Sequence, residues 1–298
     1  MNLPTLRQLQ FLTALADAGS FSRAAEACLV TQPTLSAAIK EIETLIGTPL
    51  VERTGRSSRL TGAGEIAVER ARQILAETEE MVTLARGAGA PLTGPFRLGA
   101  IPTIAPFLLP ETVKSLRDDY KELKLYLRED KTVSLLAALQ ARTLDAAIIA
   151  LPWQTPGIDT LTVGTENFQL VFPDGHKLAS KTQIFPDDIK DEALLLLEDG
   201  HCMRGHALSV CPVASADQTN GLAATSLHTL IQMVAGGLGV SLIPDMAVAS
   251  GITASLDVKT TPFSGLAQGR DIAIAWRSGS IREAEARIIG EIVRAVLP

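Results

Sequence analysis

The first thirty residues carry apolar side chains at the spacing of two short helices. Over 5–18, apolar residues recur every three or four positions, and Gly19 suits the end of that helix because glycine readily takes the left-handed conformation that closes helices. Ser22 is a good helix-capping residue, so we expect a second helix over 22–29. The pattern predicts two helices joined by a tight turn.

A third helix is predicted over 32–45, with Thr31 as its cap and Gly47 as its terminator. The second and third helices form a helix-turn-helix pattern, in which small hydroxyl and amide side chains at a helix N-terminus can reach base edges in the major groove. The segment 50–61 is typical of two short strands around a basic tip, as in a wing that touches the DNA backbone. The pattern alone is only moderately specific, because many three-helix cores look alike.

A long helix without proline is predicted over 62–86. Its small and apolar positions alternate in steps of four and three, which is a heptad seam: Ala67, Ala71, Ile74, Thr78, Met81 and Ala85. The spacing fits a dimerising helix, although a helix packed on its own domain would show a similar pattern. The Gly/Pro-rich stretch 87–95 predicts a hinge and a domain boundary.

From Phe96 onward, short apolar runs alternate with helical patterns. The predicted strands are 95–101, 123–129, 145–151, 168–173, 193–199, 239–244 and 271–276, and the predicted helices include 108–120, 132–142 and 225–237. This order predicts an α/β fold with mostly parallel sheets. We find no phosphate loop, dinucleotide-binding fingerprint or nucleophile elbow in this region.

Composition narrows the class of protein. Hydrophobic residues make up 46% and aromatic residues 4% of the chain, which indicates an aliphatic globular core. The net charge of −6 argues against a protein that coats nucleic acid over its whole surface. We see neither a signal peptide nor an apolar run long enough for a membrane span, so we expect a cytoplasmic protein that does not contact membranes. The scattered cysteines and histidines predict no metal site and no cofactor.

The segment 198–211 concentrates reactive chemistry. It contains Cys202 and Cys211, and His201, Arg204 and His206 around the first cysteine are each able to favour a thiolate. The alternative is that both cysteines are unreactive and packed in the core as small apolar residues. If 201–211 is helical, the two Cα atoms lie about 13 Å apart, whereas a disulfide requires about 4.4–6.8 Å. A bond between them therefore requires the segment to be remodelled.

The run 20–65 resembles the N-terminal domain of LysR-type transcriptional regulators almost throughout. The resemblance implies a winged helix-turn-helix, with the recognition helix over 32–45 and DNA contacts on this helix and the wing. By matching position, these contacts are Thr31, Gln32, Thr34, Ser36, Lys40, Arg53 and Arg56.

The resemblance extends over the rest of the chain. It implies a regulatory domain of two Rossmann-like subdomains, similar to periplasmic solute-binding proteins. The expected division is a DNA-binding domain over 1–60, a linker and dimerisation helix with hinge over 61–90, and a redox-sensing regulatory domain over 91–298. Within the last, 91–164 and 269–298 form subdomain I, and 165–268 form subdomain II.

Four strings, 99–110, 195–211, 224–230 and 275–280, resemble the peroxide-sensing members of that family. The resemblance implies that Cys202 reacts with peroxide and that Cys211 is its disulfide partner. It also implies a peroxide pocket formed by Thr103, Thr132, His201 and Arg277. Where such sequences often carry an acidic residue and an amide, this chain has Gly205 and His206, which leaves its peroxide sensitivity open.

These observations lead to the hypothesis of a peroxide-sensing transcriptional regulator, an activator and not an enzyme, switched by a reversible disulfide. The resemblance implies double-stranded DNA with promoter half-sites as a partner, assembly as a homodimer or homotetramer, RNA polymerase as a further partner, and cellular thiol reductants that reset the switch. Two alternatives remain: a LysR-type regulator of a small organic effector with packing cysteines, and a thiol peroxidase.

Overall fold

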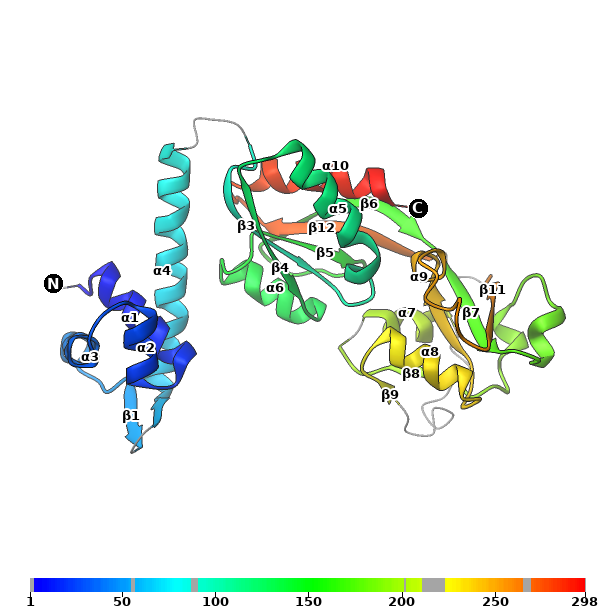
Figure 1. Cartoon of the computed structure of the whole chain (residues 1–298), viewed down its shortest axis with the longest axis horizontal. Coiled ribbons are helices and arrows are strands. Elements are labelled where there is room, and N and C mark those ends of the chain that lie inside the picture. Colours follow the sequence, from blue (N-terminus) through cyan, green and yellow to red (C-terminus); the bar gives the residue numbers. More distant parts are fainter. Residues whose placement is uncertain are drawn as a thin grey trace. The chain divides into compact units, whose positions relative to one another are not determined.

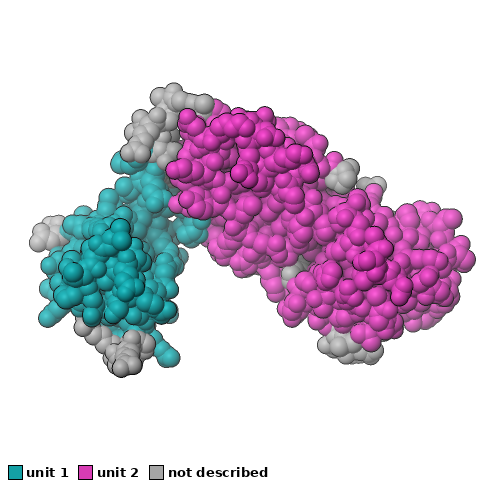
Figure 2. Space-filling view, in the orientation of Figure 1, with its two compact units in different colours: residues 1–89, 141–143 teal, residues 90–140, 144–298 magenta. Residues whose placement is uncertain are grey.

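The computed structural model describes residues 3–54, 57–86, 91–200, 202–210, 223–264 and 269–297. The chain divides into two compact units (Figure 2). The first unit comprises residues 1–89 with 141–143, and the second comprises 90–140 and 144–298. No helix in the described ranges is long and apolar enough to cross a bilayer.

Three short helices form the core of the first unit: α1 (Leu6–Ala18), α2 (Phe21–Ala27) and α3 (Gln32–Ile46). Helix α1 begins with a capping box between Thr5 and Gln8 and ends at Gly19 in the left-handed conformation. Thr31 caps α3 through the amide of Thr34, and Gly47 ends α3 in the left-handed conformation. The predicted starts and stops of these two helices are confirmed, since they depend on local side-chain and backbone preferences.

The predicted start of the second helix is wrong. Its cap is Ser20 rather than Ser22, and the first helical hydrogen bond joins the amide of Ala24 to the carbonyl of Ser20. Phe21 packs against the apolar core of the unit, so the helix begins early enough to bring that ring inward. A capping preference yields here to tertiary packing.

The remaining elements of the first unit are β1 (Val51–Thr54), β2 (Ser57–Leu60) and α4 (Gly62–Arg86). The two strands pair antiparallel as a wing. Helix α4 has the predicted bounds, and its first turns pack into the core, where Val68 and Ala71 are buried. Further along, Ile74 and Met81 are exposed and Thr78 is half-buried.

The second unit contains a five-stranded sheet with the order β4-β3-β5-β12-β6. These strands are β3 (Gly94–Ala100), β4 (Leu123–Glu129), β5 (Ala146–Ala150), β6 (Ile158–Glu166) and β12 (Arg270–Arg277). Helices α5 (Ala105–Asp119) and α10 (Glu283–Val296) cover one face and α6 (Thr132–Gln140) covers the other (Figure 1). We call this part the five-stranded half; it has its own apolar core.

A second apolar core lies in what we call the three-stranded half. Its elements are β7 (Phe168–Pro173), β8 (Leu196–Leu197), α7 (Cys202–Val210), β9 (Ala223–Ala224), α8 (Leu227–Ala235), β10 (Ser241–Pro244), α9 (Asp245–Ala249), β11 (Val258–Pro262) and two short 3-10 helices, Lys177–Ser180 and Pro186–Asp188. The main sheet has the order β10-β7-β11, and β8 pairs with β9.

The expectation of mostly parallel sheets is wrong. Strand β3 pairs parallel with β4 and β5, but β12 pairs antiparallel with β5 and β6, and the β10-β7-β11 sheet is entirely antiparallel. Strands β6 and β12 lead into and out of the three-stranded half, so they run in opposite directions beside each other. Strands β6 and β11 and helix α10 were not predicted. Strands β6 and β11 have few apolar residues, whereas α10 has apolar residues at helical spacing that could have indicated it.

Candidate functional site

The outer face of α3 presents a row of polar side chains. Gln32, Ser36 and Lys40 lie four residues apart, so they share one face of the helix. Gln32 and Lys40 are exposed and Ser36 is half-buried. Thr31 and Thr34 are also exposed, but their hydroxyls lie 2.8 Å apart and belong to the helix cap. The structure therefore brings three predicted contacts into a row and gives the two threonines a structural role.

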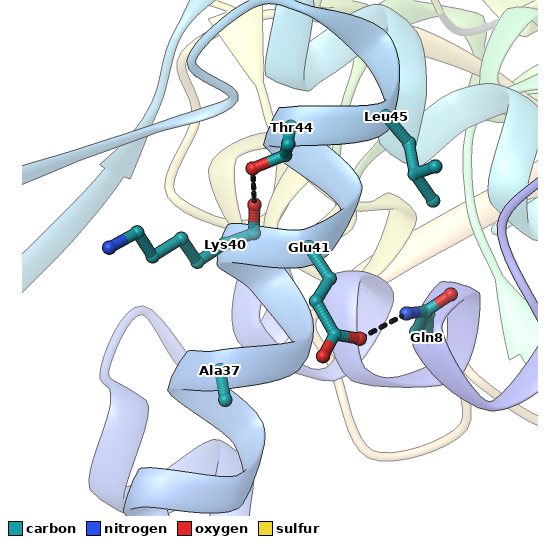
Figure 3. Close-up of a pocket in the computed structure, with 6 residues that line it drawn as sticks. All are labelled: Gln8, Ala37, Lys40, Glu41, Thr44 and Leu45. Carbon is teal, nitrogen blue, oxygen red and sulfur yellow. Dashed lines mark hydrogen bonds between the residues drawn. The ribbon is translucent and has the colours of Figure 1, made fainter.

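A hollow of about 540 Å³ adjoins this row, between the second half of α3 and the start of α1 (Figure 3). Its lining is Gln8, Ala37, Lys40, Glu41, Thr44 and Leu45. The amide of Gln8 donates to the Glu41 carboxylate at 2.8 Å, which fastens α1 to α3. In Figure 3 the Lys40 ammonium extends away from that bond. The Lys40 side chain therefore takes no part in the Gln8–Glu41 contact that joins α1 to α3.

The wing is anchored to the end of α3. The Glu43 carboxylate accepts hydrogen bonds from the amides of Leu50 at 2.8 Å and Val51 at 3.1 Å. This places β1 directly after the recognition-helix candidate. Of the two predicted wing contacts, Arg53 lies on β1 but its side chain is outside the described part, and Arg56 lies outside the described residues altogether.

In the second unit, Thr103 sits in the turn between β3 and α5 and is 2% exposed. Arg270, at the start of β12, donates to the Thr103 hydroxyl at 2.8 Å and to its carbonyl at 3.0 Å. The same guanidinium donates to Glu166 at 2.9 Å, and Glu166 also accepts from the Met246 amide at 2.8 Å. This buried network joins the end of β6 and the start of β12 to the Thr103 turn.

The charges of this network are shielded from water. Burial raises the pKa of the Glu166 carboxyl above its usual value of 4.5, while Arg270 and the Met246 amide act in the opposite direction. Because the Thr103 oxygen accepts from Arg270, the Thr103 hydroxyl proton remains available for donation to another group. Arg270 and Glu166 were not predicted from the sequence. The available signal was the pair of charged residues, Arg270 and Asp271, that precedes the apolar run 272–276, because a buried charge requires a partner.

Thr132 is the first residue of α6 and lies three residues after the end of β4. It is 1% exposed, and its hydroxyl has no hydrogen-bond partner among the described residues. Strands β3 and β4 are parallel neighbours, so Thr103 and Thr132 follow the same edge of the sheet. Buried hydroxyls are normally satisfied, so this one marks a place where a partner is missing.

The prediction that Arg277 lines the same pocket is wrong. Strand β12 is antiparallel to β5, so Arg270 lies at the edge of Thr103 and Arg277 at the opposite edge. The seven-residue separation corresponds to about 23 Å along a strand. Arg270 and Arg277 lie at opposite ends of β12. Which of them reaches Thr103 depends on the direction of β12 in the sheet, which could not be predicted from sequence spacing.

Cys202 is the first residue of α7. The helix continues to Val210, about 12 Å away along its axis. The side chains of Cys202 and His206 are outside the described part, as are His201 and Cys211 entirely. Arg204 pairs with Asp199 at 2.9 Å and donates to the carbonyl of Leu197 at 3.2 Å. Its guanidinium is therefore engaged with the preceding loop.

One contact brings this loop to the Thr132 edge. The Lys131 ammonium donates to the carbonyl of Asp199 at 2.8 Å. Lys131 directly precedes Thr132, and Asp199 lies three residues before Cys202. The start of α7 and the start of α6 are thus held close together, a proximity that was not predicted from the sequence.

The comparisons with known proteins agree with this arrangement. Residues 6–65 match the bacterial regulatory helix-turn-helix proteins of the lysR family, and residues 89–298 match the LysR substrate binding domain. The chain belongs to the LysR family of DNA-binding regulators, and the predicted order of a winged helix-turn-helix, a long helix and two α/β subdomains is confirmed.

Within the family the chain is similar to OxyR proteins. A full-length OxyR variant from Pseudomonas aeruginosa superimposes with a TM-score of 0.78 at 35% identity, covering 98% of each chain. A "Probable hydrogen peroxide-inducible genes activator" of Streptomyces viridosporus is 40% identical over 99% of this chain and 95% of its own length. The "HTH-type transcriptional regulator EstR" of Acinetobacter baylyi is 37% identical over 99% and 97%. The percentage of sequence identity to these relatives therefore does not decide which effector the chain responds to.

Proposed function

We propose that this chain is a hydrogen-peroxide-responsive transcriptional activator in which Cys202 and Cys211 form a reversible disulfide. It acts in the cytoplasm as a dimer or tetramer on promoter half-sites and contacts RNA polymerase. We assign DNA binding to 1–60, dimerisation to 61–90, and peroxide sensing to 91–298. The similarity to OxyR proteins and to a peroxide-inducible activator supports this function.

The observation that carries the proposal is the buried, unpartnered hydroxyl of Thr132. It follows the same sheet edge as Thr103, and the Lys131 contact brings the segment before Cys202 to that edge. Peroxide is small and both donates and accepts hydrogen bonds. A pocket of two threonine hydroxyls and the Arg270 guanidinium matches such a ligand. His201 is the further pocket residue that we assign.

The reaction consists of two balanced steps. The Cys202 thiolate attacks one peroxide oxygen, the O–O bond breaks, and sulfenic acid and hydroxide form. The Cys211 thiol then attacks the Cys202 sulfur, the S–O bond breaks, and a disulfide and water form. Two equivalents of a thiol reductant such as glutathione return both cysteines to the reduced form by exchange.

Helix α7 converts this chemistry into a conformational change. Helix α7 begins at Cys202 and its nine residues end directly before Cys211, so the sulfur atoms meet only if the helix unwinds. At the other end of the protein, DNA contacts are assigned to the row Gln32, Ser36 and Lys40, to the capping residues Thr31 and Thr34, and to Arg53 and Arg56 on the wing. Oligomers then present two such helices to half-sites about one DNA turn apart.

The test is mass spectrometry of the full chain after one equivalent of peroxide. We expect a Cys202–Cys211 linkage in the native chain, and in Cys202→Ser an unchanged affinity for promoter DNA with no transcriptional response to peroxide. A peroxide response that persists in Cys202→Ser would rule out the mechanism. Consumption of many equivalents of peroxide per subunit would favour a thiol peroxidase instead. A response to a metabolite that survives thiol alkylation would favour an organic effector.

A further inference from the structure

We propose that Lys131 is a positioning residue that clasps the loop before Cys202 and thereby stabilises the reduced conformation of the switch. The inference rests on the proposed function, since it concerns the equilibrium of the Cys202–Cys211 disulfide. It assigns a role to a contact between the two halves of the regulatory unit. The clasp consists of Lys131 on the five-stranded half and of 198–200 on the three-stranded half.

Three consecutive residues of the loop surround the Lys131 side chain. Its ammonium donates to the Asp199 carbonyl at 2.8 Å and lies 3.9 Å from the Glu198 carboxylate. Its stem passes over Gly200, where an added Cβ would stand 3.0 Å from the Lys131 Cδ. Gly200 has a φ of +90°, a conformation that residues with a side chain rarely adopt. A side chain at position 200 would therefore crowd the Lys131 stem and strain the loop backbone.

The clasp is coupled to the first turn of α7. Arg204 of that turn holds Asp199 through its carboxylate and Leu197 through its carbonyl. The loop is thus held from two sides: Lys131 holds the Asp199 carbonyl and Arg204 holds the Leu197 carbonyl, whereas the Arg204–Asp199 ion pair contributes little because the Asp199 side chain is 95% exposed. Disulfide formation unwinds α7 and takes Arg204 away from the loop. Because coupling is reciprocal, a contact that favours the loop in this position also favours the helical, reduced form.

The charged hydrogen bond outweighs the ion pair in this coupling. The side chains of Lys131 and Glu198 are 38% and 45% exposed, and ion pairs at such exposure contribute little. A hydrogen bond from an ammonium to a carbonyl is a stronger contact. Loss of the clasp should shift the dithiol–disulfide equilibrium about tenfold toward the disulfide. For this two-electron couple, tenfold corresponds to a midpoint potential about 30 mV more negative.

The experiment measures that midpoint in the full chain. Oxidised protein is equilibrated in glutathione buffers of graded ratio, quenched and alkylated, and the linked fraction is counted by mass spectrometry. We expect Lys131→Met to shift toward the disulfide, and Lys131→Arg to stay near the native value because it keeps a charged donor. Lys259→Met is the matched control: it breaks a half-exposed ion pair with Asp174 in the same unit, and its midpoint should not move.

A native midpoint in Lys131→Met, or a shift in the opposite direction, would overturn the clasp, as would an equal shift in the control. If Lys131→Met does not fold, Gly200→Ala tests the contact from the other side and should shift the midpoint in the same direction; no shift overturns the proposal. A native chain that forms no Cys202–Cys211 linkage would instead refute the proposed function. Hydrogen exchange separates the two failures, because Lys131→Met should speed exchange at 198–200 in the reduced protein whether or not the disulfide forms.

Discussion

Replacing Thr132 by valine should stabilise the protein and impair its reaction with peroxide at the same time. The Thr132 hydroxyl is buried without a partner among the described residues. An unsatisfied buried polar group costs about 1–3 kcal/mol. Valine has nearly the same shape and no hydroxyl, so the free energy of unfolding should rise by about 1 kcal/mol. If peroxide is the missing partner, one lost hydrogen bond should slow Cys202 oxidation roughly tenfold.

Two measurements on the same protein check this. Both tryptophans, Trp153 and Trp276, belong to the second unit, so their fluorescence during urea unfolding reports on that unit alone. Timed alkylation with mass spectrometry gives the rate at which Cys202 reacts with peroxide. Thr112→Val is the matched control, because the Thr112 hydroxyl is equally buried but donates to the Leu108 carbonyl at 2.8 Å.

The control should lose about 1 kcal/mol of stability and keep the native rate, which is the opposite pattern. If Thr132→Val is destabilised as much as the control, its hydroxyl has a structural partner and the assignment fails. If Thr132→Val is more stable yet reacts with peroxide at the native rate, the hydroxyl does not bind peroxide.

Three further predictions concern other parts of the chain. Glu166→Ala leaves Arg270 buried without its counter-charge and should lower the free energy of unfolding by about 3 kcal/mol. The urea midpoint, followed by tryptophan fluorescence, should then fall by roughly 1 M. A midpoint within ~0.2 M of the native value would contradict the buried pair. Burial raises the pKa of Asp145 above 3.8, so its neutral form contributes stability below that pH, and the contribution is lost as the pH rises through the folded pKa. Asp145→Asn cannot titrate and should therefore show a smaller loss of stability between low and neutral pH than the native chain, and identical pH profiles would refute the shift. Lys40→Ala should weaken DNA binding and reduce the slope of log affinity against log salt by about 1, and an unchanged slope in a filter-binding titration would remove Lys40 from the phosphate contacts.

The sequence predicted best what depends on neighbours along the chain. The ends of α1 and α3 follow from Thr5, Gly19, Thr31 and Gly47, whose effects are local. The long helix α4 follows from its uninterrupted pattern. The predicted cap of α2 was Ser22 and the observed cap is Ser20, because the packing of Phe21, a tertiary effect, sets the start of this helix.

The candidate pocket was only partly predictable, for a physical reason. Thr103 and Thr132 follow strands that lie side by side in parallel, so their proximity can be anticipated once the fold is known. Arg270 and Arg277 lie at the two ends of one strand, and only the direction of β12 in the sheet decides which of them reaches Thr103. Lys131 was missed because its contact joins residues far apart in sequence, in different halves of the unit.

Helix α4 gives the DNA-binding unit the mechanics of a rigid lever. Its 25 residues extend over about 37 Å, and its first turns are built into the three-helix core through Val68, Ala71 and the Arg72–Asp17 pair. A tilt of a few degrees at the start of α4 therefore moves its far end by ~3 Å. In the same way, a displacement of the far end tilts the start of the helix. A displacement of the Arg86 end is therefore carried along α4 to the core that holds α3, and in the proposed dimer it would change the spacing of the two α3 helices.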